Sequence, residues 1–313
     1  MKRRIALIVL FCIGFFPVHA SAETTPNIQP KLKPYHLLVT VGDKVQEINP
    51  RTYSVVWEYE DLQGYALFSA ERLPNRHTLI VRHKKAYEID EYGTIVWEKD
   101  VDKGDAYSAN FFDGQRLENG DTLLSGNKIQ NVKANPVGFV WQYNPAGELV
   151  WTYSSTLAFA FHEEDKLASG NTLLTSDYVK AVMEIDPNKN IVWSYNDNNH
   201  IPQAFDSDRL PNGNTLVSAL YCEDEFCNMF DYVVREVTSA GATVWQYTGL
   251  NGVPEDADRL ANGTILIADR DGGGFPDPNG PNGRIIIVNS AGQILWEYKI
   301  VGPPRDVDAI PLD

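Results

Sequence analysis

Acidic residues recur at a fixed place in a phrase that the chain repeats, and they are its first candidates for chemistry. Counted back from each Arg-Leu or its counterpart, the matching residues, which we call the entry positions, are Ser69, Asp113, Glu163, Asp206, Asp256 and Asp306. A second acidic position follows at Glu71, Asp165, Asp208, Asp258 and Asp308. A ring of carboxylates could bind Ca²⁺ or a cationic ligand, since hard cations take several oxygen ligands. The pattern also fits turn capping and hydrogen bonds at strand starts, so both interpretations stay open.

His162 precedes the entry residue Glu163 and is the candidate nucleophile. An oriented, neutral imidazole beside cations can accept a sulfuryl group and pass it on. The cations that could hold the sulfuryl oxygens are Lys133, Lys180, Arg270 and Arg305. The neighbouring carboxylates oppose this chemistry because they repel an anionic substrate. A histidine that only forms a hydrogen bond at the start of a strand is the alternative.

The other histidines beyond residue 22 are weaker candidates for catalysis or metal binding. His77 lies in a short turn, where we expect an exposed side chain without a role, and His36 begins the first repeat without an obvious partner. His83 falls in a hairpin and His200 in a connection, both on the same side as His162. No two histidines have a metal-ligand spacing, and a Gly-x-Ser-x-Gly nucleophile motif is missing.

Two further segments carry groups that can react or bind. Cys222 and Cys227 are predicted to form a disulfide that closes a loop, with free thiols or redox chemistry as the alternatives. The segment 269–279 begins Asp-x-Asp, as a calcium loop does, but Gly273 takes the next ligand position. We interpret it as a glycine-rich surface loop.

The elements that must position these groups follow from a repeated tryptophan phrase. It reads Asp/Asn-x-x-Gly-x-hydrophobic-Val-Trp-x-Tyr, and its copies end at Trp57, Trp97, Trp151, Trp193, Trp245 and Trp296. Each repeat, such as 206–247, contains four short strands joined by tight turns that include Asn-Gly. Four antiparallel strands per unit at a period of roughly 40–55 residues predict an all-β, six-bladed β-propeller.

The aromatic residues of the phrase are predicted to pack between blades. Trp and Tyr two residues apart share one face of a strand, as in Trp193 with Tyr195. Recurrence at one blade position is what packing between neighbouring repeats demands. A ligand cage built from these rings is the alternative.

The first repeat lacks its inner strand, and the C-terminus supplies a substitute. Residues 305–312 resemble 255–260, so the last segment is expected to pair with the first blade and close the ring. Turns on one face of the ring are uniformly short, whereas long variable connections such as 127–136 and 221–230 lie on the other. Variable loops on a rigid scaffold carry function, so we expect the site at the channel mouth on that face.

The N-terminus is expected to direct export. Lys2, Arg3 and Arg4 precede an apolar run, and Ala20-Ser-Ala22 fits a signal peptidase site, so residues 1–22 are predicted to be cleaved after Ala22. Residues 23–34 form a leader, and 35–313 form the propeller of a periplasmic or secreted protein without a membrane span. The formal charge is −15, and loss of the three cations would make it −18. Such an acidic chain argues against nucleic acid and anionic membranes as partners.

The repeat resembles the bacterial arylsulfotransferase family across residues 35–313. The resemblance rests on Asp-x-Asp-Arg-Leu-Pro-Asn-Gly-Asn-Thr-Leu followed by Glu-Ile-Asp-x-x-Gly-x-Ile-Val-Trp-x-Tyr. It implies an exported six-bladed propeller that moves sulfuryl groups between phenols through a histidine, without a nucleotide donor. The family's histidine before the acidic residue resembles His162 with Glu163. Phe205 and Glu255 stand at two other entrances where the family has histidines.

Two functions therefore remain. The first is an arylsulfotransferase that uses His162 with Arg305, Arg270 and Lys133 on an aryl sulfate and a phenol. The second is a non-catalytic propeller that binds a small ligand or a protein partner at an acidic channel mouth. The Asp-x-x-Gly-x-x-x-Trp phrase also resembles quinoprotein repeats, but those rings have eight blades and longer chains. We therefore expect no organic cofactor, with Ca²⁺ as the candidate ion.

Overall fold

The computed structural model describes residues 35–312 except 103, 105, 179, 180, 225 and 272–280. This part of the chain is all-β, as predicted: it contains twenty-four strands, and its one helical segment is the 3-10 turn η1 (Asp197–Asn199). The described residues belong to a single compact unit, Lys33–Asp313. The predicted signal peptide, with its predicted cut after Ala22, and the predicted leader 23–34 lie outside the described residues.

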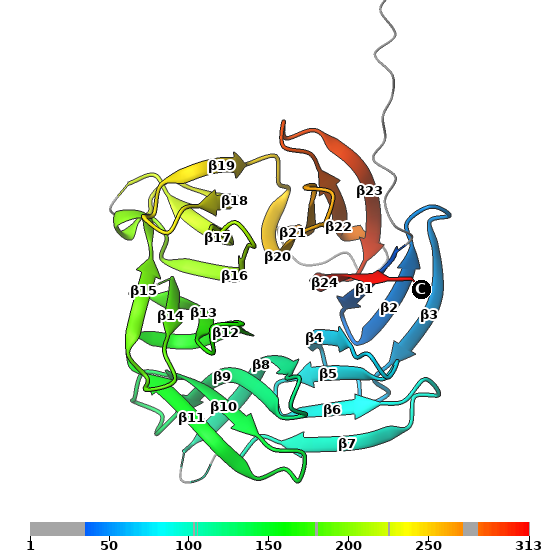
Figure 1. The fold of residues 1–313 in the computed structure, drawn as a ribbon, viewed down its shortest axis with the longest axis vertical. Coiled ribbons are helices and arrows are strands. Elements are labelled where there is room, and N and C mark those ends of the chain that lie inside the picture. Colours follow the sequence, from blue (N-terminus) through cyan, green and yellow to red (C-terminus); the bar gives the residue numbers. More distant parts are fainter. Residues whose placement is uncertain are drawn as a thin grey trace, which may run out of the picture. The chain divides into compact units, whose positions relative to one another are not determined.

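Four sheets contain four antiparallel strands each, and Figure 1 shows them arranged around a common centre in a propeller-like manner. The first sheet has the order β24-β1-β2-β3, with β24 (Pro304–Pro311), β1 (Tyr35–Val41), β2 (Lys44–Asn49) and β3 (Ser54–Glu60). The second contains β4 (Leu67–Arg72), β5 (Thr78–Arg82), β6 (Lys85–Ile89) and β7 (Ile95–Asp100). The third contains β8 (Ser108–Arg116), β9 (Thr122–Ile129), β10 (Val137–Tyr143) and β11 (Leu149–Ser155). The last contains β20 (Gly252–Arg259), β21 (Ile265–Asp271), β22 (Pro281–Val288) and β23 (Ile294–Val301).

The other eight strands form one larger sheet, which differs from the expected six separate blades. Its strands are β12 (Ala158–Lys166), β13 (Thr172–Tyr178), β14 (Val182–Ile185), β15 (Ile191–Tyr195), β16 (Gln203–Arg209), β17 (Thr215–Cys222), β18 (Phe230–Val237) and β19 (Thr243–Tyr247). A single residue pair, Asp177 with Gln203, joins the two halves. Asp177 lies at an irregularity in the β12–β13 register and beyond the pairs with β14, so its backbone is free to pair with β16.

The C-terminal strand joins the first sheet, as the sequence predicted. β24 pairs antiparallel with β1 from Tyr35 with Pro311 to Val41 with Pro304. Val307 is fully buried in the core cluster that also contains Leu37 and Ile285. The first and last repeats are therefore held together by a shared sheet and a shared core.

The tryptophans pack between neighbouring repeats, which confirms the packing interpretation. Trp193 stacks on Tyr195 with ring centroids 6.3 Å apart, and Trp245 and Tyr247 do the same at 6.4 Å. The Trp193 indole also donates a hydrogen bond of 2.8 Å to the Ser239 carbonyl in the next repeat's turn. These indoles are committed to holding repeats together and do not form a ligand cage.

At four of the six tryptophans, an arginine from the following repeat covers the ring and binds a glutamate beside it. Arg116 lies 4.8 Å from the Trp97 ring and 2.7 Å from the Glu88 carboxylate. The same Arg–Glu–Trp contact recurs for Arg72 with Glu47 and Trp57, Arg209 with Glu184 and Trp193, and Arg259 with Glu236 and Trp245. Cation–π and charged hydrogen-bond geometry therefore explain why these residue types recur together.

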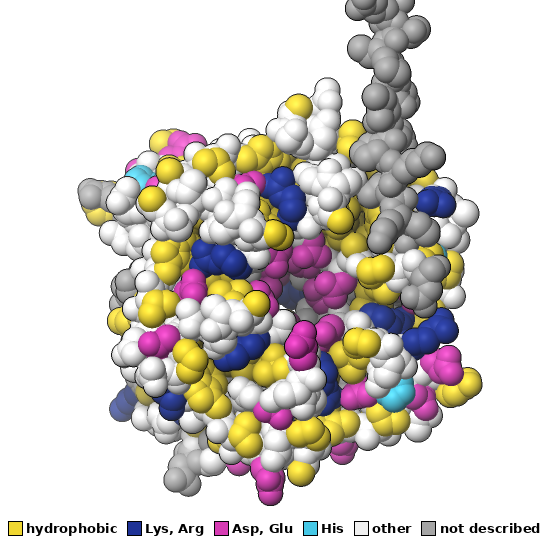
Figure 2. All heavy atoms as spheres, viewed as in Figure 1, with side chains coloured by type: hydrophobic (Ala, Val, Ile, Leu, Met, Phe, Trp, Pro, Cys, Tyr) yellow, Lys and Arg dark blue, Asp and Glu magenta, His cyan; other side chains and the backbone are white. Residues whose placement is uncertain are grey.

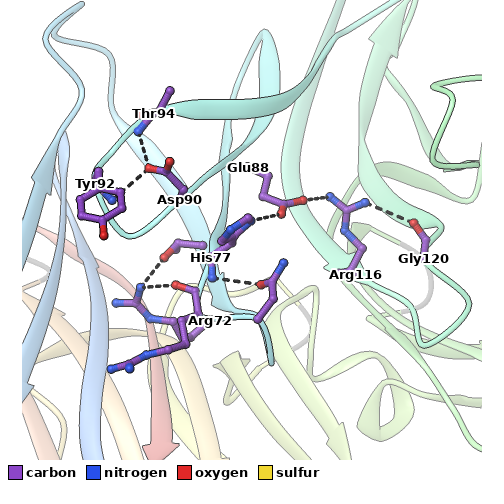
Figure 3. Close-up of polar contacts among 11 residues, drawn as sticks. Arg72, His77, Glu88, Asp90, Tyr92, Thr94, Arg116 and Gly120 are labelled. Carbon is purple, nitrogen blue, oxygen red and sulfur yellow. Dashed lines mark hydrogen bonds and ion pairs between the residues drawn. The ribbon is translucent and has the colours of Figure 1, made fainter.

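The Arg–Glu–Trp contact at Trp97 also involves His77, which was predicted to have no role. Figure 3 shows Glu88 between Arg116 and His77, whose Nδ1 lies 2.6 Å from the carboxylate. His36 is placed similarly, 2.6 Å from Glu47. The expectation that His77 is a bystander and that His36 lacks a partner is wrong, because each lies in a turn or strand beside a repeat glutamate.

Candidate functional site

The inner strand of every repeat contains a β-bulge at the same place. The ladders of β4, β8, β12, β16, β20 and β24 each skip the residue immediately before the entry position. The skipped residues are Phe68, Phe112, His162, Phe205, Glu255 and Arg305. A bulge leaves one residue outside the pairing and redirects its side chain, which is common next to functional sites.

All six bulged residues line one cavity of about 220 Å³, which we call the mouth cavity; Gln203 and Arg270 complete its lining. Gln203 lies at the start of β16 and Arg270 near the end of β21. Long connections leave the sheets at these strand ends, so the cavity lies on the face predicted to carry the site. Three of the four predicted catalytic residues, His162, Arg270 and Arg305, meet here.

The two arginines of the mouth cavity share one carboxylate. Arg270 Nε binds Glu255 Oε1 in a short contact, and Arg305 Nη1 lies 3.3 Å from the same oxygen. The Arg305 guanidinium also lies over the Phe68 ring, 5.2 Å from its centroid. Arginine heads fixed in this way present donors in a set direction, and planar forks of this type suit tetrahedral oxyanions.

His162 lines the same cavity as this charge group. Its Nε2 is 3.8 Å from Asp177 Oδ2 and 3.4 Å from Gln203 Nε2. The ring packs against Phe112 with centroids 5.6 Å apart. The imidazole therefore has an aromatic neighbour and two polar neighbours, and about a quarter of its side chain is exposed.

A second histidine supports the aromatic wall. His83 stacks on Phe68 with centroids 4.2 Å apart and meets Phe112 edge-on at 5.4 Å. Burial lowers the pKa of His83, and the positive charges of Lys84 and Arg305 lower it further. A neutral imidazole at this place fills space behind the two phenylalanines.

Lys133 does not belong to the site. It lies in an exposed turn between β9 and β10, where its backbone N–H donates to Asn131, and it does not line the mouth cavity. The prediction that Lys133 clamps a ligand is therefore wrong, because a loop position read from sequence alone gave no direction for the side chain. Lys180 lies outside the described residues.

The carboxylates at the entry positions form hydrogen bonds between neighbouring inner strands. Each accepts the backbone N–H of the residue just after the entry position on the next inner strand. The contacts are Asp306 with Ala70 at 2.6 Å, Asp113 with Glu164 at 3.3 Å, Glu163 with Ser207 at 2.9 Å, Asp206 with Ala257 at 2.8 Å and Asp256 with Val307 at 2.6 Å. We call this series the carboxylate belt. It supports the structural interpretation of the acidic positions, because the oxygens already have donors between repeats.

The second acidic position extends the belt along the channel. A cavity of about 230 Å³ is lined by both acidic layers, including Glu71, Asp165, Asp208, Asp258 and Asp308. Figure 2 shows acidic side chains gathered in the central opening. Among the described residues, no group of three or more His, Cys, Asp and Glu side chains is arranged to hold a metal ion.

Burial changes the acidity of this channel. It raises the pKa of Asp306 and of Asp208 to about 7, with nearby carboxylates adding to the effect. The pKa values of Asp256 and Asp258 are raised well above the usual range for the same two reasons. The channel therefore holds protons that isolated carboxyl groups would release.

The calcium-like segment beginning at Asp269 is structural where it is described. The buried Asp269 carboxylate accepts the N–H groups of Asn251 and Gly252 and pairs with Arg284 at 2.8 Å. Residues 272–280, with the rest of the predicted loop, lie outside the described residues.

The cysteine prediction is confirmed. Cys222 and Cys227 form a disulfide, which fits an oxidising compartment. His200 lies beside it and contacts the Cys222 carbonyl at 2.7 Å through Nδ1, so its place is in this loop and outside the mouth cavity. No helix among the described residues is long and apolar enough to cross a membrane.

Sequence reasoning missed five lining residues: Phe68, Phe112, Phe205, Gln203 and, as a site residue, Glu255. Four of them stand immediately before an entry position, so the register of the repeat contained the signal. What was missing was the bulge, which turns that residue into the cavity and does not show in the alternation of side chains.

The chain matches no protein-family model and no curated protein sequence. It is similar to the crystal structure of a protein of unknown function from Bacteroides caccae, with 20% identity, a TM-score of 0.67, and coverage of 89% of this chain and 100% of the other. A streptogramin B lyase structure matches with 11% identity and a TM-score of 0.54, and the match covers 86% of this chain and 84% of the lyase chain. A catalytically inactive variant of virginiamycin B lyase from Staphylococcus aureus with Quinupristin matches with 12% identity, a TM-score of 0.54 and coverage of 86% and 86%. At these identities the likeness establishes the propeller-like fold that the chain shares with them.

Proposed function

We propose that the chain binds an aryl sulfate in the mouth cavity and transfers its sulfuryl group to a phenol through His162. One observation carries the proposal: the bulges bring three phenylalanines, an imidazole and Arg305 to the same cavity as Arg270. Aromatic walls suit the aryl group, and guanidinium donors suit the sulfate oxygens. The resemblance of the repeat phrases to arylsulfotransferases points the same way.

The reaction needs two displacements at sulfur. His162 Nε2 attacks the sulfur, and the bond from sulfur to the aryl oxygen breaks, so that the electron pair leaves on a phenolate. The acceptor phenol oxygen then attacks the same sulfur, the nitrogen–sulfur bond breaks, and the electron pair returns to the imidazole. The acceptor's proton ends on the departed phenolate. Arg270 and Arg305 stabilise the equatorial sulfuryl oxygens in both steps.

A transfer assay tests this function directly. With 4-nitrophenyl sulfate as donor and phenol as acceptor, we expect release of 4-nitrophenolate that depends on the acceptor, and loss of that release in His162→Ala. His77→Ala is the matched control, since His77 binds Glu88 away from the mouth cavity and should leave the rate intact. Absence of transfer by the wild type, or an undiminished rate in His162→Ala, would overturn the proposal.

We further propose that strands β12–β15 and β16–β19 act as two blades of a six-bladed ring. Each half has four consecutive strands, and one residue pair joins them. We also propose export through a signal peptide cleaved after Ala22, for which the disulfide is supporting chemistry. Sequencing the N-terminus of the protein recovered outside the cytoplasm should give Glu23, and an intact Met1 there would contradict cleavage.

A second candidate is a non-catalytic binding propeller, and Glu255 is the observation that favours it. Its carboxylate occupies both guanidiniums, and the 3.8 Å separation of His162 from Asp177 leaves the imidazole without a short orienting contact. Calcium binding by the entry carboxylates belongs to this candidate. An inactive wild type whose melting temperature rises with Ca²⁺ would support it, whereas transfer activity without such a rise would oppose it.

A further inference from the structure

We propose that Glu255 makes the mouth cavity selective for singly charged esters over doubly charged ones, an inference that rests on the proposed aryl ester site. Sulfate monoesters carry one negative charge, whereas phosphate monoesters of the same shape carry close to two above a pKa of about 6. Glu255 is thus a specificity-determining residue that acts through charge.

The ion pairs of Glu255 with two arginines determine the net charge of the mouth cavity. Glu255 binds Arg270 and Arg305 through the same carboxylate oxygen, and the side chain of Glu255 is only 12% exposed. These are the charged residues that line the cavity among the described residues, apart from His162. Two guanidiniums and one carboxylate leave a single net positive charge for the ligand, enough to balance a monoanion.

The residues that follow Glu255 in β20 and Arg305 in β24 add to the selection against doubly charged ligands. Asp256 follows Glu255 and Asp306 follows Arg305, and both carboxyl groups point into the channel as members of the carboxylate belt. At pH 8 the second negative charge of such a ligand would lie near Glu255 and near Asp306, whose pKa of about 7 leaves that carboxyl group largely ionised. Like charges placed together at a binding site penalise the wrong ligand, which is a common basis of specificity.

The position of Glu255 in the strand allows substitutions that should remove the selectivity for singly charged ligands. Glu255 is a bulged residue outside the strand pairing, so its side chain can be exchanged without altering the register of β20 with β21. Glu255→Gln keeps the size and an oxygen acceptor for the arginines but removes the negative charge. Glu255→Asp keeps the charge and shortens the side chain.

Isothermal titration calorimetry of the full chain with three ligands at pH 8 tests the proposal. Phenyl sulfate and methyl phenyl phosphate are monoanions, and phenyl phosphate is mostly a dianion. We expect the wild type to bind both monoanions about tenfold more tightly than phenyl phosphate. In Glu255→Gln this preference should fall about tenfold, so that the variant binds all three ligands with similar affinity. Glu255→Asp should retain the preference, and so should the control Glu297→Gln, whose residue pairs with Arg284 outside the cavity.

The outcomes separate this inference from the proposed function. Equal binding of phenyl phosphate and phenyl sulfate by the wild type, or an unchanged preference in a folded Glu255→Gln variant, would overturn the role of Glu255 and leave the ester site standing. Selective binding of the monoanions without sulfuryl transfer would support Glu255 and overturn the transferase. Failure of all three ligands to bind the wild type would overturn both.

Discussion

At the scale of single residues, the turn between β4 and β5 lacks the glycine that the matching turns of the other repeats contain. Gly120, Gly170, Gly213 and Gly263 have φ between 83° and 88°, and Arg76 takes the equivalent place with φ of 71°. The left-handed region costs a residue with a Cβ atom about 1–2 kcal/mol. Arg76 therefore carries local strain that its counterparts avoid.

Arg76→Gly should raise the free energy of unfolding by about 0.5–1 kcal/mol. Glycine removes the Cβ penalty, and the greater freedom of the unfolded chain offsets part of the gain. The Arg76 carbonyl, which accepts a hydrogen bond from Arg72, stays in place. Urea denaturation of the wild type and the variant measures the difference.

Gly213→Arg is the reverse change at the matching turn and should lower stability. Nothing lies within 4 Å of a Cβ atom built at Gly213, so the effect would be conformational and free of steric clash. Equal stability of all three proteins would show that the turn conformation costs nothing here.

The residue scale also shows where sequence reasoning succeeds and where it stops. His162 and Arg305 could be assigned to one side of the ring because the Arg-Leu phrase or its counterpart gives each a known place in its repeat, and Arg270 because it lies in a long variable connection. The phenylalanines could not, because alternation assigns a face only while the ladder is regular. Lys133 was misplaced for a related reason: its loop has no periodic pattern to give its direction.

At the scale of elements, the junction between the last and first repeats lacks the Arg–Glu–Trp contact, and its residues at those positions are apolar. Ala309 and Ile287 take the places that arginine and glutamate have in the Arg–Glu–Trp contact, and both belong to the apolar cluster around Trp296. Apolar packing and the β24–β1 ladder therefore hold this junction without an ion pair.

Removal of residues 304–313 should abolish the cooperative thermal transition. The deletion removes the partner of β1 along its whole length, the buried Val307 and the Asp306 carboxylate that binds Ala70. An unpaired β1 edge would also favour aggregation. Calorimetry checks this, with removal of residues 312–313 as the control, and a truncated chain that melts like the wild type would refute it.

Arg116→Ala should lower the free energy of unfolding by about 2 kcal/mol, because it leaves the Glu88 carboxylate without its guanidinium and uncovers Trp97. Chemical denaturation measures the loss. Arg51→Ala, at an exposed turn position, is the comparison and should change stability by less than about 0.5 kcal/mol.

The elements themselves were largely predictable. Tight turns with Asn-Gly or Asp-x-x-Gly fixed the hairpins, and the resemblance of 305–312 to an inner strand fixed the closing pair. The union of two repeats into an eight-stranded sheet was not predictable. It depends on one backbone pair between Asp177 and Gln203, and neither side chain marks it.

At the scale of the whole molecule, the acidic channel should make stability depend on pH. Folding raises the pKa of Glu71, Asp208 and Asp306 to about 7, whereas unfolded carboxyl groups titrate near 4. Between these values the folded state holds protons that the unfolded state has released, so the free energy of unfolding falls as pH rises. The melting temperature should therefore be higher at pH 5 than at pH 8.

Asp258→Asn separates the channel from other sources of pH dependence. Burial and the charges of Asp208 and Asp306 raise the pKa of Asp258 well above its usual range, so a neutral amide should stabilise the protein at pH 8 and flatten its pH profile. Glu58→Gln, at an exposed outer-strand position, should leave the profile as it is. A wild type that melts at a constant or rising temperature from pH 5 to pH 8 would contradict this account.

The bulges of the inner strands have a consequence for how this scaffold can diversify. Six cavity-lining side chains come from residues that take no part in the ladders, and the entry carboxylates beside them bind the repeats together. The lining of the mouth cavity and the contacts between repeats are therefore assigned to adjacent but separate residue positions. A library randomised only at the six bulged positions should yield mostly folded proteins that differ in the lining of the mouth cavity.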